Sequence, residues 1–221
     1  MTADHDHAPE RLALSTTDGL RLRAEWNPGA DGATATSDEP FPTTVLCHPH
    51  PLHGGNMHAH VIDALFRALP SIGVSALRFN FRGVQGSDGR HDHGDRERLD
   101  VAAAIDHAIE LRPNAPVRLI GWSFGADLAL ATSHDAIDQW VAIAPPLRVV
   151  DATTMAAGPD RRSKHLIVGE RDAFRPPADA AEATAEWVNT RIDQIDGADH
   201  FFGATLPQLV EIIAGGFGDQ I

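Results

Sequence analysis

The chain has 221 residues, of which 43% are hydrophobic, and this suits one globular domain over residues 1–221. A net charge of −13, with Lys164 as the one lysine, argues against nucleic acid and anionic membranes as partners, and the single Cys47 excludes an internal disulfide or a cysteine-rich zinc site. Without a secretory leader or a run of about 18 uncharged apolar residues, we expect a cytoplasmic protein whose residues 1–9 form a flexible tail.

The first predicted elements form a β-hairpin. Segments 11–17 and 20–26 alternate polar and apolar residues on either side of Asp18-Gly19, a pair typical of tight turns. A loop of small polar residues follows at 31–40. The chain therefore begins with an antiparallel pair.

From residue 43 onward, apolar runs alternate with helical patterns. We predict strands at 43–47, 74–79, 116–122, 139–144, 164–169 and 190–195, and helices at about 57–69, 95–111, 124–133, 178–189 and 204–214. Apolar strands that alternate with amphipathic helices imply an α/β fold with a mostly parallel sheet and helices on both of its faces.

The motif GWSFG, residues 121–125, lies between a predicted strand and a predicted helix. In an open α/β sheet, ligands bind at the carboxyl ends of the strands. So tight a turn strains the serine backbone, the two glycines remove side chains that would collide, and the helix N-terminus offers N–H groups to an oxyanion. This context predicts that Ser123 is a nucleophile, rather than an ordinary serine in a glycine-rich turn.

A serine nucleophile needs a base and an acid from later strand ends. His200, after the strand 190–195, is our prediction for the base; His165 lies inside a strand and is the weaker alternative. We favour Asp172 as the acid and leave Glu170 open, because both follow the strand 164–169. Asp199 is expected to order the loop before His200.

An oxyanion hole needs the N–H of Phe124 and a second N–H from the loop after the strand 43–47. Proline has no N–H, so Pro49 and Pro51 are excluded. His50 and Leu52 remain, and we favour His50 because of its position just beyond the end of the strand.

The many histidines raise the alternative of a metal site at His48, His50, His53, His58 and His60. Residues two apart on a helix, such as His58 and His60, point in different directions, and no H-E-x-x-H motif occurs. We expect neither a metal nor another cofactor.

Four segments together carry a resemblance: CHPHPLHGGNM, LRFNFRGVQGSDG, GWSFGA and GADHFF. With them the chain resembles the α/β-hydrolases, and most of all a small bacterial subgroup of predicted hydrolases related to dienelactone hydrolases. Their chain order is serine, acid, histidine, as in Ser123, Asp172 and His200. Two departures are Gln85, where the subgroup tends to have glycine, and Ser123, where dienelactone hydrolases have cysteine.

The resemblance implies acyl transfer to water on a small-molecule substrate. About 18 residues separate the strands 139–144 and 164–169, too few for a large helical lid, so we expect an open site lined by Leu52, Trp122, Pro145 and Phe174. Short acyl esters are the first expectation; thioesters, lactones and small amides fit the same residues. An acyltransferase and a non-catalytic binding protein are the alternatives, and the sequence leaves the oligomeric state open.

Overall fold

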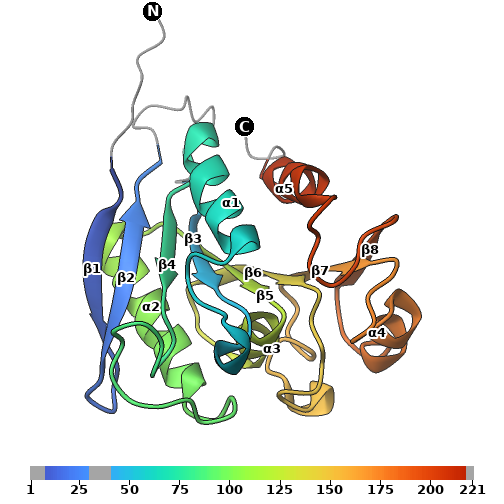
Figure 1. Ribbon diagram of the computed structural model, residues 1–221, viewed down its shortest axis with the longest axis horizontal. Coiled ribbons are helices and arrows are strands. Elements are labelled where there is room, and N and C mark those ends of the chain that lie inside the picture. The colour runs from blue at the N-terminus through green and yellow to red at the C-terminus, as the bar shows by residue number, and fades with distance from the viewer. Residues whose placement is uncertain (1–7, 30–40, 218–221) are drawn as a thin grey trace, which may run out of the picture.

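An eight-stranded sheet forms the centre of the computed structural model, which describes residues 8–29 and 41–217 (Figure 1). The strands follow the spatial order β1-β2-β4-β3-β5-β6-β7-β8. Their bounds are β1 Glu10–Ser15, β2 Arg21–Asn27, β3 Thr43–Cys47, β4 Ala76–Phe79, β5 Val117–Trp122, β6 Ile137–Ile143, β7 Ser163–Gly169 and β8 Thr190–Ile195. The predicted polar loop 31–40 and residues 1–7 of the predicted tail lie outside the described residues.

Strand β2 runs against its neighbours, whereas the other pairings are parallel. It pairs antiparallel with β1 on one side and with β4 on the other. The turn between β1 and β2 closes through a hydrogen bond from the Gly19 N–H to the Thr16 carbonyl, and Gly19 has a φ of +87°. The predicted hairpin and the mostly parallel sheet are thus confirmed.

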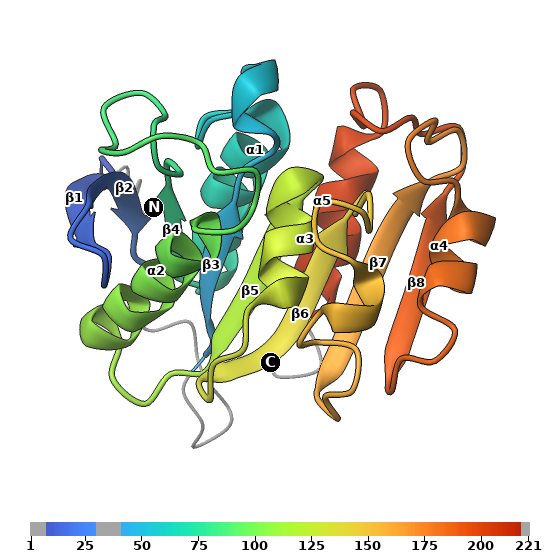
Figure 2. The ribbon, with the colours of Figure 1, turned by 90° about the horizontal axis from the view of Figure 1, so that it is seen from below.

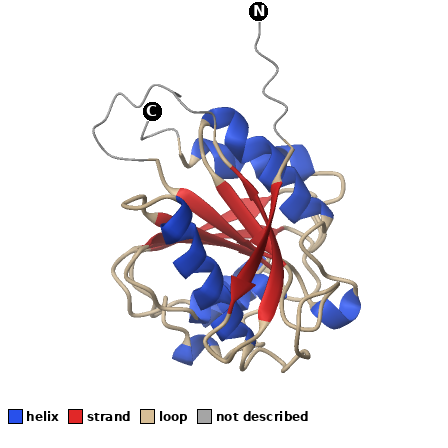
Figure 3. Ribbon diagram, turned by 90° about the vertical axis from the view of Figure 1, so that its left-hand side faces the viewer, coloured by secondary structure: helices blue, strands red, loops and turns tan. Residues whose placement is uncertain are grey.

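Helices cover both faces of the sheet, as Figures 2 and 3 show. One face carries α2 (Glu97–Leu111), α3 (Phe124–Ala131) and α4 (Pro177–Ala183), and the other carries α1 (His60–Ala68) and α5 (Leu206–Gly215). Short 3-10 helices occur at η1 Pro51–His53, η2 Leu69–Ile72 and η3 Ala152–Thr154.

The two layers explain why the central strands are apolar without alternation. In β5, Leu119 packs into the cluster under α2 and α3, while its neighbour Ile120 packs into the cluster under α1 and α5. Successive side chains of a strand point to opposite faces, so a strand buried on both sides needs an apolar residue at every position.

All five predicted helices are present with somewhat different bounds, and two of these differences have a clear local cause. The predicted helix 178–189 ends at Ala183, because the following turns fold onto a distant loop: the Val188 N–H donates to the Gly158 carbonyl, and Trp187 packs against Gly158. The last helix begins at Leu206 rather than 204, with Pro207 in its first turn, where a missing N–H costs nothing.

The connection between β6 and β7 contains one 3-10 turn, η3, and no large lid, as predicted. Gln85 has a φ of +37°, so the turn keeps the left-handed backbone for which glycine is the favoured residue. Within residues 8–29 and 41–217, no helix is long and apolar enough to cross a membrane.

Candidate active site

Ser123 occupies a strained turn between β5 and α3. Its backbone has φ +55° and ψ −121°, and its N–H donates to the Ile143 carbonyl at the end of β6. A Cβ at Gly121 would lie 2.3 Å from the Gly125 carbonyl oxygen, and one at Gly125 would lie 2.3 Å from the Cys47 carbonyl oxygen. Both glycines are therefore required for α3 to pack this closely against the sheet.

The structure brings Ser123, His200 and Asp172 together in one hydrogen-bonded series. His200 Nε2 lies 2.9 Å from Ser123 Oγ, and His200 Nδ1 lies 2.8 Å from Asp172 Oδ2. The other carboxylate oxygen, Oδ1, accepts hydrogen bonds from the N–H groups of Phe174 and Arg175. An ionised carboxylate only accepts hydrogen bonds, so it holds a proton on Nδ1 and leaves Nε2 to accept the serine proton.

The environment of Asp172 keeps its carboxylate ionised. Burial opposes ionisation, but the hydrogen bond from His200 and the backbone N–H groups outweigh it, so the pKa of Asp172 is lowered below its usual value. The geometry thus supplies a charged partner for the imidazole at neutral pH.

The alternative residues lie elsewhere. Glu170 accepts a hydrogen bond from the Gly197 N–H, and His165 Nε2 lies 3.0 Å from Asp193 Oδ2 of the neighbouring strand. Asp199 Oδ1 accepts hydrogen bonds from the Phe201 and Phe202 N–H groups, which is the loop-ordering contact that we expected.

Phe124 and His50, the residues predicted to supply backbone N–H groups, both line the cavity beside Ser123. In the described part of the chain, the N–H groups of Phe124 and His50 have no hydrogen-bond partner. The Leu52 N–H is taken by His50 Nδ1 at 3.2 Å. Burial, with His91 and His53 nearby, lowers the pKa of the His50 ring, which keeps this nitrogen an acceptor. Of the two residues left open by the sequence, His50 is the one with a disengaged N–H.

Gly55 allows the loop after β3, which contains His50, to fold tightly. The His50 carbonyl accepts hydrogen bonds from the His53 and Gly55 N–H groups. A Cβ at Gly55 would lie 2.1 Å from the Pro49 carbonyl oxygen, so no other residue fits there. The preceding His48 is buried, which lowers its pKa to about 3, and its Nε2 accepts a hydrogen bond from the Phe81 N–H.

A cavity of about 630 Å³ opens above Ser123. Trp122 and Phe174 line it, as predicted, but Leu52 and Pro145 do not. The side chain of Leu52 is 66% exposed on η1, and Pro145 is buried. Ala144 and Leu147 have positive φ, and the loop between them turns so that Pro146 lines the cavity instead of Pro145.

Three supporting residues were missed by the sequence reasoning. Asp127, on α3, accepts hydrogen bonds from three successive backbone N–H groups at 147–149. His60, which begins α1, donates from Nε2 to the Phe201 carbonyl at 2.7 Å, and Trp122 Nε1 donates to the His200 carbonyl. Arg148 lines the cavity. Asp127 and His60 could have been predicted to have these roles only from a knowledge of which loops are in contact.

The histidines do not converge on a metal. Over residues 8–29 and 41–217, no three histidine, cysteine, aspartate or glutamate side chains are arranged to hold a metal ion. Those near the cavity pack against each other and against Phe124, as His50 does with its ring centroid 5.0 Å from that of Phe124.

Comparison with known proteins places this geometry in context. Residues 50–191 match the protein family described as "Serine aminopeptidase, S33". The chain is 36% identical over 182 residues to RP471, an uncharacterized protein of Rickettsia prowazekii. The aligned residues make up 77% of this chain and 75% of that protein.

Solved structures agree over almost the whole length. A serine hydrolase homologue from Coxiella burnetii is 26% identical, with a TM-score of 0.82 over 96% of this chain and 99% of that one. XC6422 of Xanthomonas campestris, described as a serine hydrolase without lid, is 27% identical, with a TM-score of 0.82 over 96% and 94% of the two chains.

Proposed function

The chain belongs to the α/β-hydrolase family described as "Serine aminopeptidase, S33", and from this premise we propose that it is a serine hydrolase that cleaves small acyl esters through an acyl-enzyme. The observation that carries the proposal is the series from Ser123 Oγ through His200 to Asp172, with distances of 2.9 and 2.8 Å, at the base of an open cavity. Neither a metal nor another cofactor is needed for this chemistry.

In the proposed reaction, His200 Nε2 takes the proton of Ser123 while Oγ attacks the ester carbonyl. Asp172 holds the proton on Nδ1 and stabilises the imidazolium that forms. The tetrahedral intermediate collapses as His200 protonates the leaving alcohol, and water then enters the same cycle to release the acid. The strained turn at Ser123 supports this role because it presents the serine to the cavity at the carboxyl end of β5.

The negative charge of the tetrahedral intermediate would be held by the N–H groups of Phe124 and His50. Both residues line the cavity, and neither N–H is engaged elsewhere among the described residues. A donor already aimed at the developing charge needs no rearrangement, and removal of one such donor typically costs about 10²–10³ in turnover.

The cavity suits an ester better than the N-terminus of a peptide. An aminopeptidase must bind a cationic α-amino group, for which a carboxylate is the natural partner. The residues that line the cavity include no aspartate or glutamate, and they do include Arg148. We therefore do not extend the family's descriptive name to the substrate of this chain.

The proposal is tested with 4-nitrophenyl esters of increasing acyl length, together with amino-acid 4-nitroanilides. We expect hydrolysis of the short esters to exceed that of the anilides. Ser123→Ala should lower kcat/KM by about 10⁴–10⁶, because the serine, histidine and acid act as one unit. Ser133→Ala, an exposed serine just beyond α3, is the matched control and should leave kcat/KM unchanged.

A fluorophosphonate probe gives an independent result, because it labels an activated serine without needing the right substrate. Labelling should be lost in Ser123→Ala and retained in Ser133→Ala. Esterase activity that survives Ser123→Ala would overturn the mechanism, and absence of labelling in the native protein would favour a non-catalytic binding protein.

A further inference from the structure

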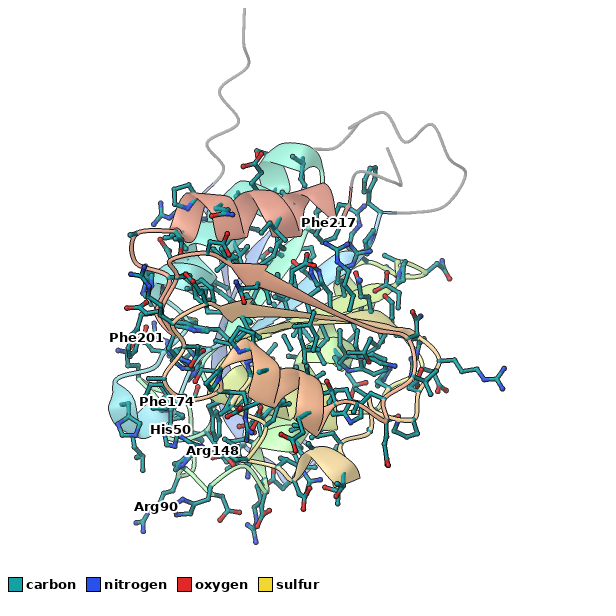
Figure 4. The ribbon with its side chains drawn as sticks, turned by 90° about the vertical axis from the view of Figure 1, so that its right-hand side faces the viewer. His50, Arg90, Arg148, Phe174, Phe201 and Phe217 are labelled. Atoms are coloured by element: carbon teal, nitrogen blue, oxygen red, sulfur yellow. The ribbon has the colours of Figure 1, made fainter. Side chains whose placement is uncertain are left out.

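Arg148 places an unpaired positive charge at the cavity. Its guanidinium is exposed and lies over the ring of Phe174, with 5.8 Å from Cζ to the ring centroid. In Figure 4, Arg148 lies on the same side of the molecule as His50, Phe174 and Phe201, which also line the cavity. Within the described residues, its side chain makes neither an ion pair nor a hydrogen bond.

The backbone of Arg148 is fixed even though its side chain has no partner. Its N–H donates to Asp127 Oδ2 at 2.9 Å, as does the N–H of Val149. The guanidinium is therefore carried by a rigid segment at the cavity wall, and Phe174 provides a surface on which it stacks.

Several arginines of this chain are paired with carboxylates. Arg78 contacts Glu25 and Asp63, and Arg82 contacts Asp18 and Asp100. Unpaired arginines also occur elsewhere among the described residues, as at Arg90, so what distinguishes Arg148 is its place at the cavity. The chain has 31 acidic residues and 18 lysines and arginines, yet Arg148 lines the cavity and no carboxylate does.

We propose that Arg148 binds a carboxylate on the substrate, so that the enzyme prefers esters that carry an anionic group. A guanidinium is planar and presents two parallel N–H groups to a carboxylate, which makes it well suited to this partner. The apolar surface of Phe174 would accommodate the methylene groups between the carboxylate and the ester. This inference rests on the proposed function and adds the substrate class to it.

The test compares two esters of the same shape and different charge. Mono(4-nitrophenyl) adipate ends in a carboxylate, and 4-nitrophenyl 6-methylheptanoate ends in an isopropyl group of similar size. We expect kcat/KM for the anionic ester to be about tenfold higher, and Arg148→Ala to abolish this ratio. Arg148→Glu should invert it.

Arg90→Ala is the matched control. Arg90 is also exposed, has no ion-pair partner among the described residues and does not line the cavity. Figure 4 shows its side chain farther along the same side of the molecule. The charge ratio should survive in Arg90→Ala, whereas an equal loss in both variants would indicate a general field effect and overturn the assignment to Arg148.

A second arm places the carboxylate on the leaving group, with 4-carboxyphenyl butanoate against 4-isopropylphenyl butanoate. Raising the NaCl concentration to 0.5 M should reduce whichever preference depends on Arg148, because salt screens an exposed ion pair.

If Ser123 is needed for hydrolysis but neither arm depends on Arg148, this inference fails and the proposed function stands. If no ester is hydrolysed in a Ser123-dependent way, the proposed function fails, and the inference with it.

Discussion

Two loops meet at the cavity, and each is organised by one buried aspartate. In the β7–α4 loop, Asp172 accepts hydrogen bonds from the N–H groups of Phe174 and Arg175. In the loop after β6, Asp127 reaches across from α3 and accepts hydrogen bonds from the N–H groups at 147–149. Each carboxylate thus holds its loop in one conformation by accepting hydrogen bonds from successive backbone N–H groups.

Their pKa values nevertheless move in opposite directions. Burial raises the pKa of Asp127 to about 6, and backbone hydrogen bonds only partly offset it. For Asp172 the penalty of burial is outweighed, chiefly because the His200 ring donates to it, and its pKa is lowered. Backbone N–H partners are enough to hold a loop, but an imidazole partner makes the aspartate a stable anion, and only an anion can stabilise the imidazolium that forms.

Among the changes that test this comparison, Asp172→Asn should have the largest effect. An asparagine keeps the shape but no longer holds the proton on His200 Nδ1, so kcat/KM should fall by about 10³–10⁴ while the fold remains intact. Glu170→Gln is the control and should change kcat/KM less than threefold, since Glu170 contacts the Gly197 N–H and Arg171, neither of which belongs to the series from Ser123 to Asp172. A comparable loss in both variants would contradict the assignment of the acid.

Opposite pKa shifts predict opposite pH dependences of stability. Asp127 has a raised pKa, so its contribution is greatest below its usual value of 3.8 and is lost as the pH rises through about 6. The free energy of unfolding of the native protein, minus that of Asp127→Asn, should therefore decrease by up to roughly 3 kcal/mol between pH 4 and 7.

For Asp172 the sign is reversed. Its lowered pKa contributes stability above its usual value of 3.8, and this is lost as the pH falls through the lowered pKa. The corresponding difference for Asp172→Asn should therefore increase with pH. Urea unfolding followed by tryptophan fluorescence measures both differences, and two slopes of the same sign would refute the comparison.

The sheet could be predicted because its central strands are short apolar runs and its hairpin strands alternate polar and apolar residues. The helix 178–189 could not be bounded, because its end depends on Trp187 reaching Gly158, and local propensity carries no information about that contact. Chain order at strand ends was sufficient to bring Ser123, Asp172 and His200 into one hypothesis.

The cavity walls were harder to predict than its base. Whether Pro145 or Pro146 lines the cavity is decided by the positive φ values of Ala144 and Leu147, two residues without the usual glycine signal. The role of Asp127 could not be predicted from the sequence either. In the sequence it is one acidic residue in the first turn of a helix, and only the folded loop after β6 gives it three hydrogen-bond partners.

The smallest predicted effect comes from Arg175, a side chain that joins the two loops by a hydrogen bond. Arg175 Nε donates to the Pro146 carbonyl at 2.9 Å, so a residue of the Asp172 loop supports the segment held by Asp127. Arg175→Met removes this hydrogen bond and should lower kcat/KM by about three- to tenfold. The change should lie mainly in KM, because Pro146 lines the cavity while the bonds from Asp172 to His200 and to Ser123 are retained.

Arg171→Met is the control for that change, since Arg171 lies in the same loop with a side chain that is 74% exposed. The Arg175 charge also helps to lower the pKa of Asp127, so its removal should raise that pKa further. The decrease in stability attributed to Asp127 would then extend to a higher pH in Arg175→Met than in the native protein, and would keep its native pH range in Arg171→Met. If the Arg175 side chain only supported the loop, its removal would leave the pH range of this decrease unchanged. A shift of that range therefore indicates electrostatic coupling between the two loops.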